Sequence, residues 1–380
     1  MLTPHRRSFI QGVAATIATL WWTQPSRAIP ATLRFPATWK RVADPINANN
    51  GSHLSPYQMA ADTSVVQEGS SYRLYFTGND SRERVGIAQA HSRDGLNWTT
   101  HKKAVRPDPI VDLVVAPGST WGVTGLETAH AMKTPQGQNR LYYTEDLLPN
   151  GTTYAIGLAT SSDGMPWKRS GTTPIFKALR SWEQPVNGVG GVLEPCVLYD
   201  PAARLSKMWY VGCGMRNGVH SYRVGYAISP NGINSWTRRD NPVLERGLAG
   251  TWDELWVSHV NVVADPAGGY HMFYHGTAAS EYVEGAVMQR GCVGHAYSLD
   301  GIRWLRNPNN PIIRPRVGKF DAWAITSPTA IFVKGKLRVY YSGFATSDLT
   351  SNVGVVEAAT MYPAYPAFSA LADPGLWQAT

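Results

Sequence analysis

The chain has 380 residues and a formal net charge of +8, with only 16% charged residues and abundant Gly, Pro, Trp and Tyr. This composition favours a turn-rich β protein, and no run of Lys and Arg is dense enough to indicate nucleic-acid binding. Its three cysteines argue against a disulfide scaffold, although one Cys196–Cys213 bridge and free buried thiols both stay open. The basic charge suits attraction to anionic glycans as well as plain solubility.

The first 28 residues have the features of an export signal. Residues 5–10 (His-Arg-Arg-Ser-Phe-Ile) resemble the twin-arginine motif, residues 12–22 are apolar, and Ser26-Arg27-Ala28 offers a small-x-small cleavage site. We expect cleavage after Ala28 and a periplasmic or secreted bacterial protein without stable membrane insertion. An uncleaved leader that tethers the chain to a membrane is the alternative.

Residues 37–46 form an isolated predicted strand that contains Trp39. Four similar tryptophan strands follow, so that successive tryptophans are 59 to 69 residues apart. A period near 70 residues with several strands per unit indicates a radial β architecture rather than a short-period solenoid. The tryptophans are Trp39, Trp98, Trp167, Trp236 and Trp304.

Each repeat predicts four strands: an apolar run, a tyrosine-rich run such as residues 72–78, a glycine-containing strand, and the tryptophan strand. A Ser-x-Asp/Asn-Gly turn, as at residues 92–95, precedes each of the later tryptophans. Asp-Gly and Asn-Gly pairs supply left-handed turns, so we expect these segments to be structural, with the tryptophans packed between units.

The last unit ends near residue 358 without a tryptophan strand of its own, and the strand around Trp39 can fill that gap. This is the way in which a β-propeller closes its ring without a long exposed edge. We therefore predict an all-β, five-bladed β-propeller with four-stranded blades, closed by the N-terminal strand. It would occupy residues 29–360, with residues 361–380 as a C-terminal tail.

One position recurs at the start of the first strand of every unit, 16 to 18 residues before the end of the tyrosine-rich run. Because first strands line the central channel of a propeller, these residues should ring its mouth. Carboxyl groups gathered there repel one another, which raises the pKa of at least one of them. A protonated and an ionised carboxyl flanking one bond are what glycoside hydrolysis requires. The residues are Asp62, Glu127, Glu194, His259 and Ser327.

Five blades, Asp62, an acid on the second blade and the Glu194-Pro195 pair together resemble the clan of arabinanases, β-xylosidases and fructan hydrolases, especially glycoside hydrolase family 43. The resemblance implies that Asp62 is the general base, Glu127 tunes pKa and orients, and Glu194 is the general acid. It also implies that His259 helps to hold a cation through water. No cofactor is expected to be required, and a structural calcium ion in the central channel is left open.

Two departures from the family pattern affect the mechanism. Glu127 stands where the family has Asp, and Asp62 is followed by Thr-Ser-Val-Val rather than by the motif of retaining fructan hydrolases. We therefore expect inverting hydrolysis of arabinan-, xylan- or fructan-like glycans by a monomer whose partner is an oligo- or polysaccharide. A non-catalytic carbohydrate-binding propeller and a related phosphorylase or transglycosidase remain alternatives.

Aromatic residues before the ring positions could stack on sugar rings, whose C–H faces are apolar. For the aromatic residues that recur in the repeat, packing between blades is the alternative to stacking on sugar. Trp256 lies one step off the repeat, which makes it the stronger candidate. The predicted substrate-binding residues are Trp256, His259, Ser327, Trp121 and Trp182.

Overall fold

The computed structural model describes residues 35–43, 47–48, 60–79, 85–100, 115, 125–146, 153–216, 219–286, 288–348 and 351–361. The predicted leader, Trp121 and the predicted tail after residue 361 lie outside these ranges. The described chain is nearly all β, with two single-turn 3-10 helices, η1 (Ser181–Glu183) and η2 (Ala279–Glu281). Its helices are too short to cross a membrane.

The described strands form four sheets, and antiparallel pairing divides them into five groups, because a short parallel pairing joins the second and third groups into one eight-stranded sheet. The first contains β3 (Ala61–Glu68), β4 (Ser71–Asn79), β5 (Val85–Ser92) and β6 (Asn97–Thr100), with β2 (Asn47–Ala48) beside β6. The second contains β7 (Leu126–Lys133), β8 (Asn139–Asp146), β9 (Thr153–Ser161) and β10 (Lys168–Arg169). The third contains β11 (Gly190–Asp200), β12 (Leu205–Arg216), β13 (Val219–Ser229) and β14 (Thr237–Arg238). The fourth contains β15 (Trp256–Ala264), β16 (Tyr270–Thr277), β17 (Cys292–Ser298) and β18 (Leu305–Arg306). The fifth contains β19 (Ala324–Val333), β20 (Lys336–Phe344), β21 (Ser351–Met361) and β1 (Pro36–Ala43).

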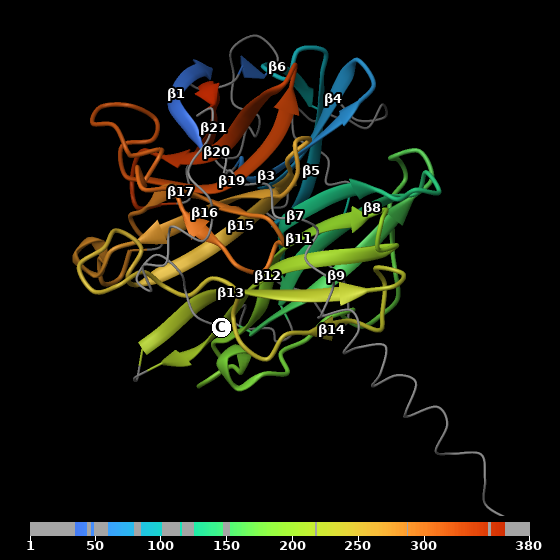
Figure 1. Cartoon of the computed structure of the whole chain (residues 1–380), viewed down its shortest axis with the longest axis horizontal. Coiled ribbons are helices and arrows are strands. Elements are labelled where there is room, and N and C mark those ends of the chain that lie inside the picture. The colour runs from blue at the N-terminus through green and yellow to red at the C-terminus, as the bar shows by residue number, and fades with distance from the viewer. Residues whose placement is uncertain are drawn as a thin grey trace, which may run out of the picture.

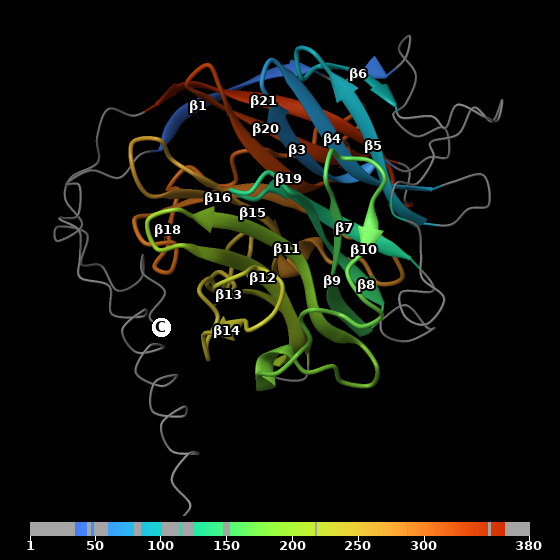
Figure 2. The same ribbon diagram turned by 90° about the vertical axis from the view of Figure 1, so that its right-hand side faces the viewer.

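The N-terminal strand pairs with the C-terminal strand, as the isolated tryptophan strand predicts. β1 runs antiparallel to β21, with Trp39 opposite Ala358, and the two lie side by side in Figure 2. The first strands contact one another in a cycle, in which β3, β7, β11, β15 and β19 follow in order and β19 also contacts β3. These strands surround the middle of the molecule in Figure 1.

The repeated tryptophans pack between neighbouring groups, which confirms their predicted structural role. Trp98 lies edge-on to Tyr340 of the fifth group, with ring centroids 6.2 Å apart. Trp39 meets Phe273 of the fourth group in the same way, at 5.7 Å. Edge-to-face aromatic pairs of this kind add about 1 kcal/mol to the burial of their surface.

The turn residues are structural as well. Oδ1 of Asp94 accepts hydrogen bonds from the backbone N–H groups of Leu96 and Asn97, both at 2.8 Å. Oγ of Ser92 accepts from the N–H of Gly95 at 2.9 Å. The side chains thus satisfy the backbone of a tight turn, and Gly95 provides the positive φ of 73° that the turn needs.

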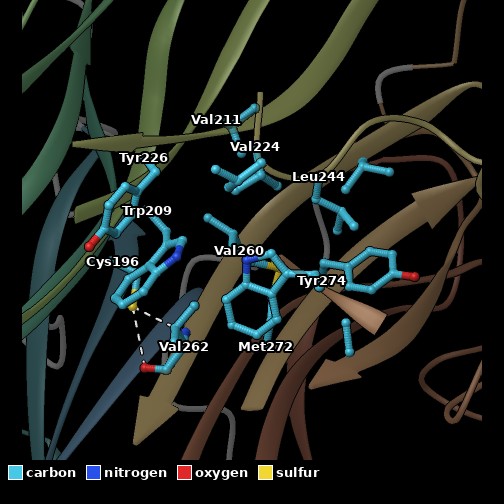
Figure 3. Close-up of a cluster of buried hydrophobic side chains, with 14 of the residues drawn as sticks. Cys196, Trp209, Val211, Val224, Tyr226, Leu244, Val260, Val262, Met272 and Tyr274 are labelled. Atoms are coloured by element: carbon cyan, nitrogen blue, oxygen red, sulfur yellow. Dashed lines mark hydrogen bonds between the residues drawn. The ribbon is translucent and has the colours of Figure 1, made fainter. Parts of the chain in front are cut away.

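A buried apolar cluster joins the third and fourth groups (Figure 3). It contains Val211, Val224 and Val260 together with Cys196, whose Sγ accepts from the N–H of Val262 at 3.1 Å and donates to its carbonyl at 3.5 Å. The thiol therefore acts as an inter-strand hydrogen-bonding group. All three cysteines are free, so Cys196 and Cys213 form no bridge.

Candidate active site

The first strand of each group is interrupted by a residue in the left-handed region, at which the pairing register shifts. A positive φ costs roughly 1–3 kcal/mol at a residue other than glycine, so five such residues in equivalent places indicate a conformation that the fold enforces. They are Asp62 (φ 51°), Thr128 (φ 52°), Glu194 (φ 54°), His259 (φ 48°) and Ser327 (φ 49°). We call these five the ring residues.

The second ring residue corrects the alignment made from sequence. Thr128 occupies the position assigned to Glu127, which lies one residue earlier, opposite Thr144 of β8. Successive side chains of a strand point to opposite faces, so a shift of one residue changes what a side chain meets. Glu127 is half-buried and does not line the cavity described next.

The ring residues line one cavity. The residue after each of them contributes to its wall, together with His130 and Asn261. Each of the five groups therefore contributes the equivalent short segment of its first strand to the wall. Asp62, Glu194, His259 and Ser327, predicted to meet at a channel mouth, do lie together.

His259 stands between the two carboxyl groups of the cavity. Its Nε2 is 3.4 Å from Oε1 of Glu194 and 3.7 Å from Oδ1 of Asp62. Those two oxygens are therefore no more than about 7.1 Å apart, the sum of the two distances. Burial lowers the pKa of His259 to about 3, so the imidazole is neutral at neutral pH.

Asp62 accepts several hydrogen bonds. The hydroxyl of Ser327 donates to its Oδ1 at 2.5 Å. Burial raises the pKa of Asp62 above its ordinary value, while hydrogen bonds from Ser327, Thr77 and the backbone N–H of Thr128 act in the opposite direction. Because donors stabilise the ionised form, they limit the effect of burial.

Glu194 has fewer donors and more negative neighbours. Its Oε2 accepts a hydrogen bond from the backbone N–H of His259. Burial raises its pKa well above the ordinary value, and the charges of Asp62 and Glu127 raise it further against that one donor. One carboxyl with three donors thus faces another with a single donor, which favours protonation of Glu194 over protonation of Asp62.

Trp182 does not line the cavity, in contrast to its predicted role in substrate binding. It stacks on Tyr210, with centroids 6.1 Å apart and planes at 16°, and its Nε1 donates to the carbonyl of Asp240 at 2.8 Å. Trp252 stacks in the same way on Tyr274 in the fourth group. This recurring aromatic therefore packs within its own group.

Trp256 lies at the start of β15, three residues before His259. It meets Tyr222 edge-on at 5.4 Å and Tyr282 at 5.9 Å. Burial raises the pKa of Tyr222, and the charge of Glu194 adds to this increase. Like Trp182, neither Trp256 nor Tyr222 is among the described residues that line the cavity.

The described residues contain no group of three or more His, Cys, Asp or Glu side chains that could hold a metal ion. Nε2 of His259 faces two carboxyl groups across 3.4 and 3.7 Å.

Neither a family model nor a curated protein matches this sequence. Solved structures do match the fold. A thermostable family-43 glycoside hydrolase is 18% identical, covers 80% of this chain and 89% of its own, and has a TM-score of 0.59. A β-1,2-mannobiose phosphorylase from Listeria innocua is 14% identical, with 79% and 89% covered and a TM-score of 0.55. A structure from work on mannoside phosphorylases and related hydrolases of family 130 is 16% identical, with 90% and 98% covered and a TM-score of 0.57. The chain thus has the β-propeller fold of family-43 glycoside hydrolases, as the sequence resemblance predicts, and a mannobiose phosphorylase has a similar fold.

Proposed function

We propose that this protein is a glycoside hydrolase in which Glu194 is the general acid and Asp62 the general base. The observation that carries the proposal is the pair of carboxyl groups, Glu194 buried and Asp62 partly buried, that face His259 in one cavity with unequal sets of hydrogen-bond donors. Environments that separate the pKa values of two carboxyl groups are those that assign acid and base roles in glycosidases.

Two proton transfers, one from water and one to the leaving sugar, accompany a single displacement at the anomeric carbon. Asp62 removes a proton from a water molecule, whose oxygen forms the new bond to the anomeric carbon. Glu194 donates its proton to the glycosidic oxygen as the bond to the leaving sugar breaks. The water attacks the face opposite the leaving group, so the configuration at the anomeric carbon inverts.

The scaffold of this site would be a ring of five blades. The five antiparallel groups, the cycle of contacts between their first strands and the pairing of β1 with β21 support this architecture. Glu127 would raise the proton affinity of Glu194 through its charge.

Substrate would be held beside the carboxyl pair. Trp256 and its neighbour Tyr222 offer aromatic surface on which a sugar ring can stack, and His259 and Ser327 offer polar atoms inside the cavity. Arabinan-, xylan- or fructan-like glycans are the proposed substrates, and the twin-arginine leader would bring the enzyme to the periplasm or the exterior.

Phosphorolysis is the alternative that the mannobiose phosphorylase keeps open. A phosphorylase must bind phosphate, usually with Arg, Lys or His. Among the described residues that line the cavity none is Arg or Lys, and burial lowers the pKa of its two histidines, His130 to about 4 and His259 to about 3, so that neither is charged at neutral pH. Water is therefore the better-supported nucleophile.

The experiment is a panel of chromogenic glycosides and polysaccharides, with and without phosphate, and NMR of the first-formed anomer. The Asp62→Asn/Glu194→Gln double variant controls for contaminating activity. We expect phosphate-independent release of the inverted sugar by the wild type alone. Phosphate-dependent cleavage would establish a phosphorylase, and sugar binding without turnover would establish a non-catalytic protein.

A further inference from the structure

One side-chain position recurs on the second strand of every group, beside the ring residues. In each group, this residue pairs across the sheet with the first-strand residue that comes just before the ring residue. Three of its occupants carry hydroxyl groups, and each accepts the backbone N–H of the ring residue in the next group. These bonds are Thr128 to Thr77 at 3.1 Å, Glu194 to Thr144 at 2.8 Å, and Asp62 to Ser342 at 3.0 Å.

The third and fourth groups break this pattern, with Val211 and His275 at this position. Val211 pairs with Leu193 in register and is fully buried in the apolar cluster that also contains Val260 (Figure 3). A valine accepts no hydrogen bond, and the N–H of the next ring residue, His259, donates to Oε2 of Glu194 instead. The substitution in the repeat thus redirects one backbone donor to a carboxyl group.

The same position distinguishes the two acids of the site. In the first group, the hydroxyl of Thr77 accepts the N–H of Thr128 and is also hydrogen-bonded to the carboxyl of Asp62. In the third group, Val211 presents only methyl groups where that hydroxyl would be. Asp62 and Glu194 therefore occupy equivalent ring positions, but only Asp62 has a hydroxyl donor at this place on the second strand of its group.

The charges that act on Glu194 are those of acids, and its Oε2 accepts the backbone N–H of His259. The groups that face it are Asp62, Glu127, His259, Cys213 and Tyr222. The first two are acids, and burial keeps the imidazole, the thiol and the phenol neutral at neutral pH. Arg223 of β13 lies over the ring of Trp182 at 5.6 Å.

We propose that Val211 is a positioning residue that keeps the proton on Glu194, because it withholds the hydroxyl that stabilises the ionised form of Asp62 at the equivalent place. This inference rests on the proposed role of Glu194 as general acid. Thr at position 211 would accept the N–H of His259 and donate to the Glu194 carboxylate, as Thr77 does for Asp62. Valine and threonine have nearly the same shape, so the change tests the hydroxyl itself.

The test is Val211→Thr, followed by infrared difference spectroscopy of the protonated carboxyl band during pH titration. The Glu194 signal is identified by its loss in Glu194→Gln. A hydrogen bond to a charged group predicts a midpoint lower by about one pH unit, and the alkaline limb of the activity profile should move with it. The matched control is Val224→Thr, which places a hydroxyl in the same cluster on the adjacent strand β13 and should leave the midpoint unchanged.

The mirror variant, Thr77→Val, removes the donor from Asp62 and should raise the Asp62 midpoint by a similar amount, so a failure of Val211→Thr to fold does not end the test. An unchanged Glu194 midpoint in folded Val211→Thr, an equal shift in Val224→Thr, or an unchanged Asp62 midpoint in Thr77→Val would overturn the inference. The infrared readout needs no substrate. If the midpoints move as expected but no glycoside is cleaved, the proposed hydrolase function fails and the assignment of Val211 stands.

Discussion

The hydroxyl of Ser327 donates a hydrogen bond to Oδ1 of Asp62 over 2.5 Å, between residues 265 positions apart in the sequence. The two residues are the ring residues of the fifth and first groups, whose first strands are in contact. One short hydrogen bond therefore joins the last group to the first at the proposed base and stabilises the ionised form of its carboxyl group.

Ser327→Ala should weaken the base. Loss of the hydroxyl removes a donor that lowers the pKa of Asp62, so this pKa should rise by about one unit and the acidic limb of the activity profile should move to higher pH. Ser327→Thr keeps the hydroxyl, and Thr128 shows that threonine is accommodated at a ring position. The pH dependence of kcat/KM for both variants checks this prediction, which fails if the two profiles coincide.

Glu127→Gln should make Glu194 a stronger acid. The negative charge of Glu127 raises the pKa of Glu194, so its removal should move the alkaline limb of the profile to lower pH, by up to about one unit. Glu127→Asp keeps the charge and should retain most of the wild-type limb. A profile unaffected by Glu127→Gln would show that this charge does not act on the acid.

Buried histidines should make the fold sensitive to acid. Burial lowers the pKa of His130 from 6.5 to about 4. Between these values the unfolded chain binds a proton that the folded chain does not, so stability falls as the pH falls through this window. This single group should account for about 3 kcal/mol of that loss.

Urea unfolding of His130→Gln at several pH values between 7 and 4 measures this contribution. The variant should lose less stability on acidification than the wild type. His91→Gln changes an exposed histidine and should leave the pH dependence as it is. Parallel curves for His130→Gln and the wild type would contradict the assignment.

Three free thiols should be titrated after unfolding without reductant, because all three cysteines are free. In the native protein, the fully buried Cys196 and Cys213 should resist thiol reagents, while the half-buried Cys292 should react first. A single thiol after unfolding would reveal a disulfide.

Much of the site follows from repetition in the sequence. The Ser-x-Asp/Asn-Gly turns that precede the tryptophans use the same residue types in each copy. Asp62, Glu194, His259 and Ser327 can be aligned because the segments around them repeat. The strand around Trp39 had no partner in its own unit, which was enough to predict its pairing at the other end of the chain.

The second ring residue could not be located in this way. The ring position is defined by backbone conformation, and Asp, Thr, Glu, His and Ser all occupy it. The distance to the end of the following strand varies between groups, so Glu127 and Thr128 fit the repeat equally well. The acidic residue was preferred because its chemistry matched the expected site.

Val211 is visible in the sequence as a departure from the repeat. The residue just before the end of each tyrosine-rich run is Thr77, Thr144, Val211, His275 or Ser342. The valine is conspicuous only once the hydroxyl groups are known to accept the N–H of the next ring residue. That information lies in contacts between groups, which periodicity along one strand does not report.

The most direct test of the account compares Glu194→Gln with Asp62→Asn on two aryl glycosides, one with a good leaving group and one with a poor one. A good leaving group departs without a proton, so Glu194→Gln should keep most of its kcat/KM on that substrate and lose about a hundredfold or more on the other. Asp62→Asn should lose activity on both, because water must be activated in each case. Equal losses of Glu194→Gln on the two substrates, or full activity of both variants, would contradict the assignment of acid and base.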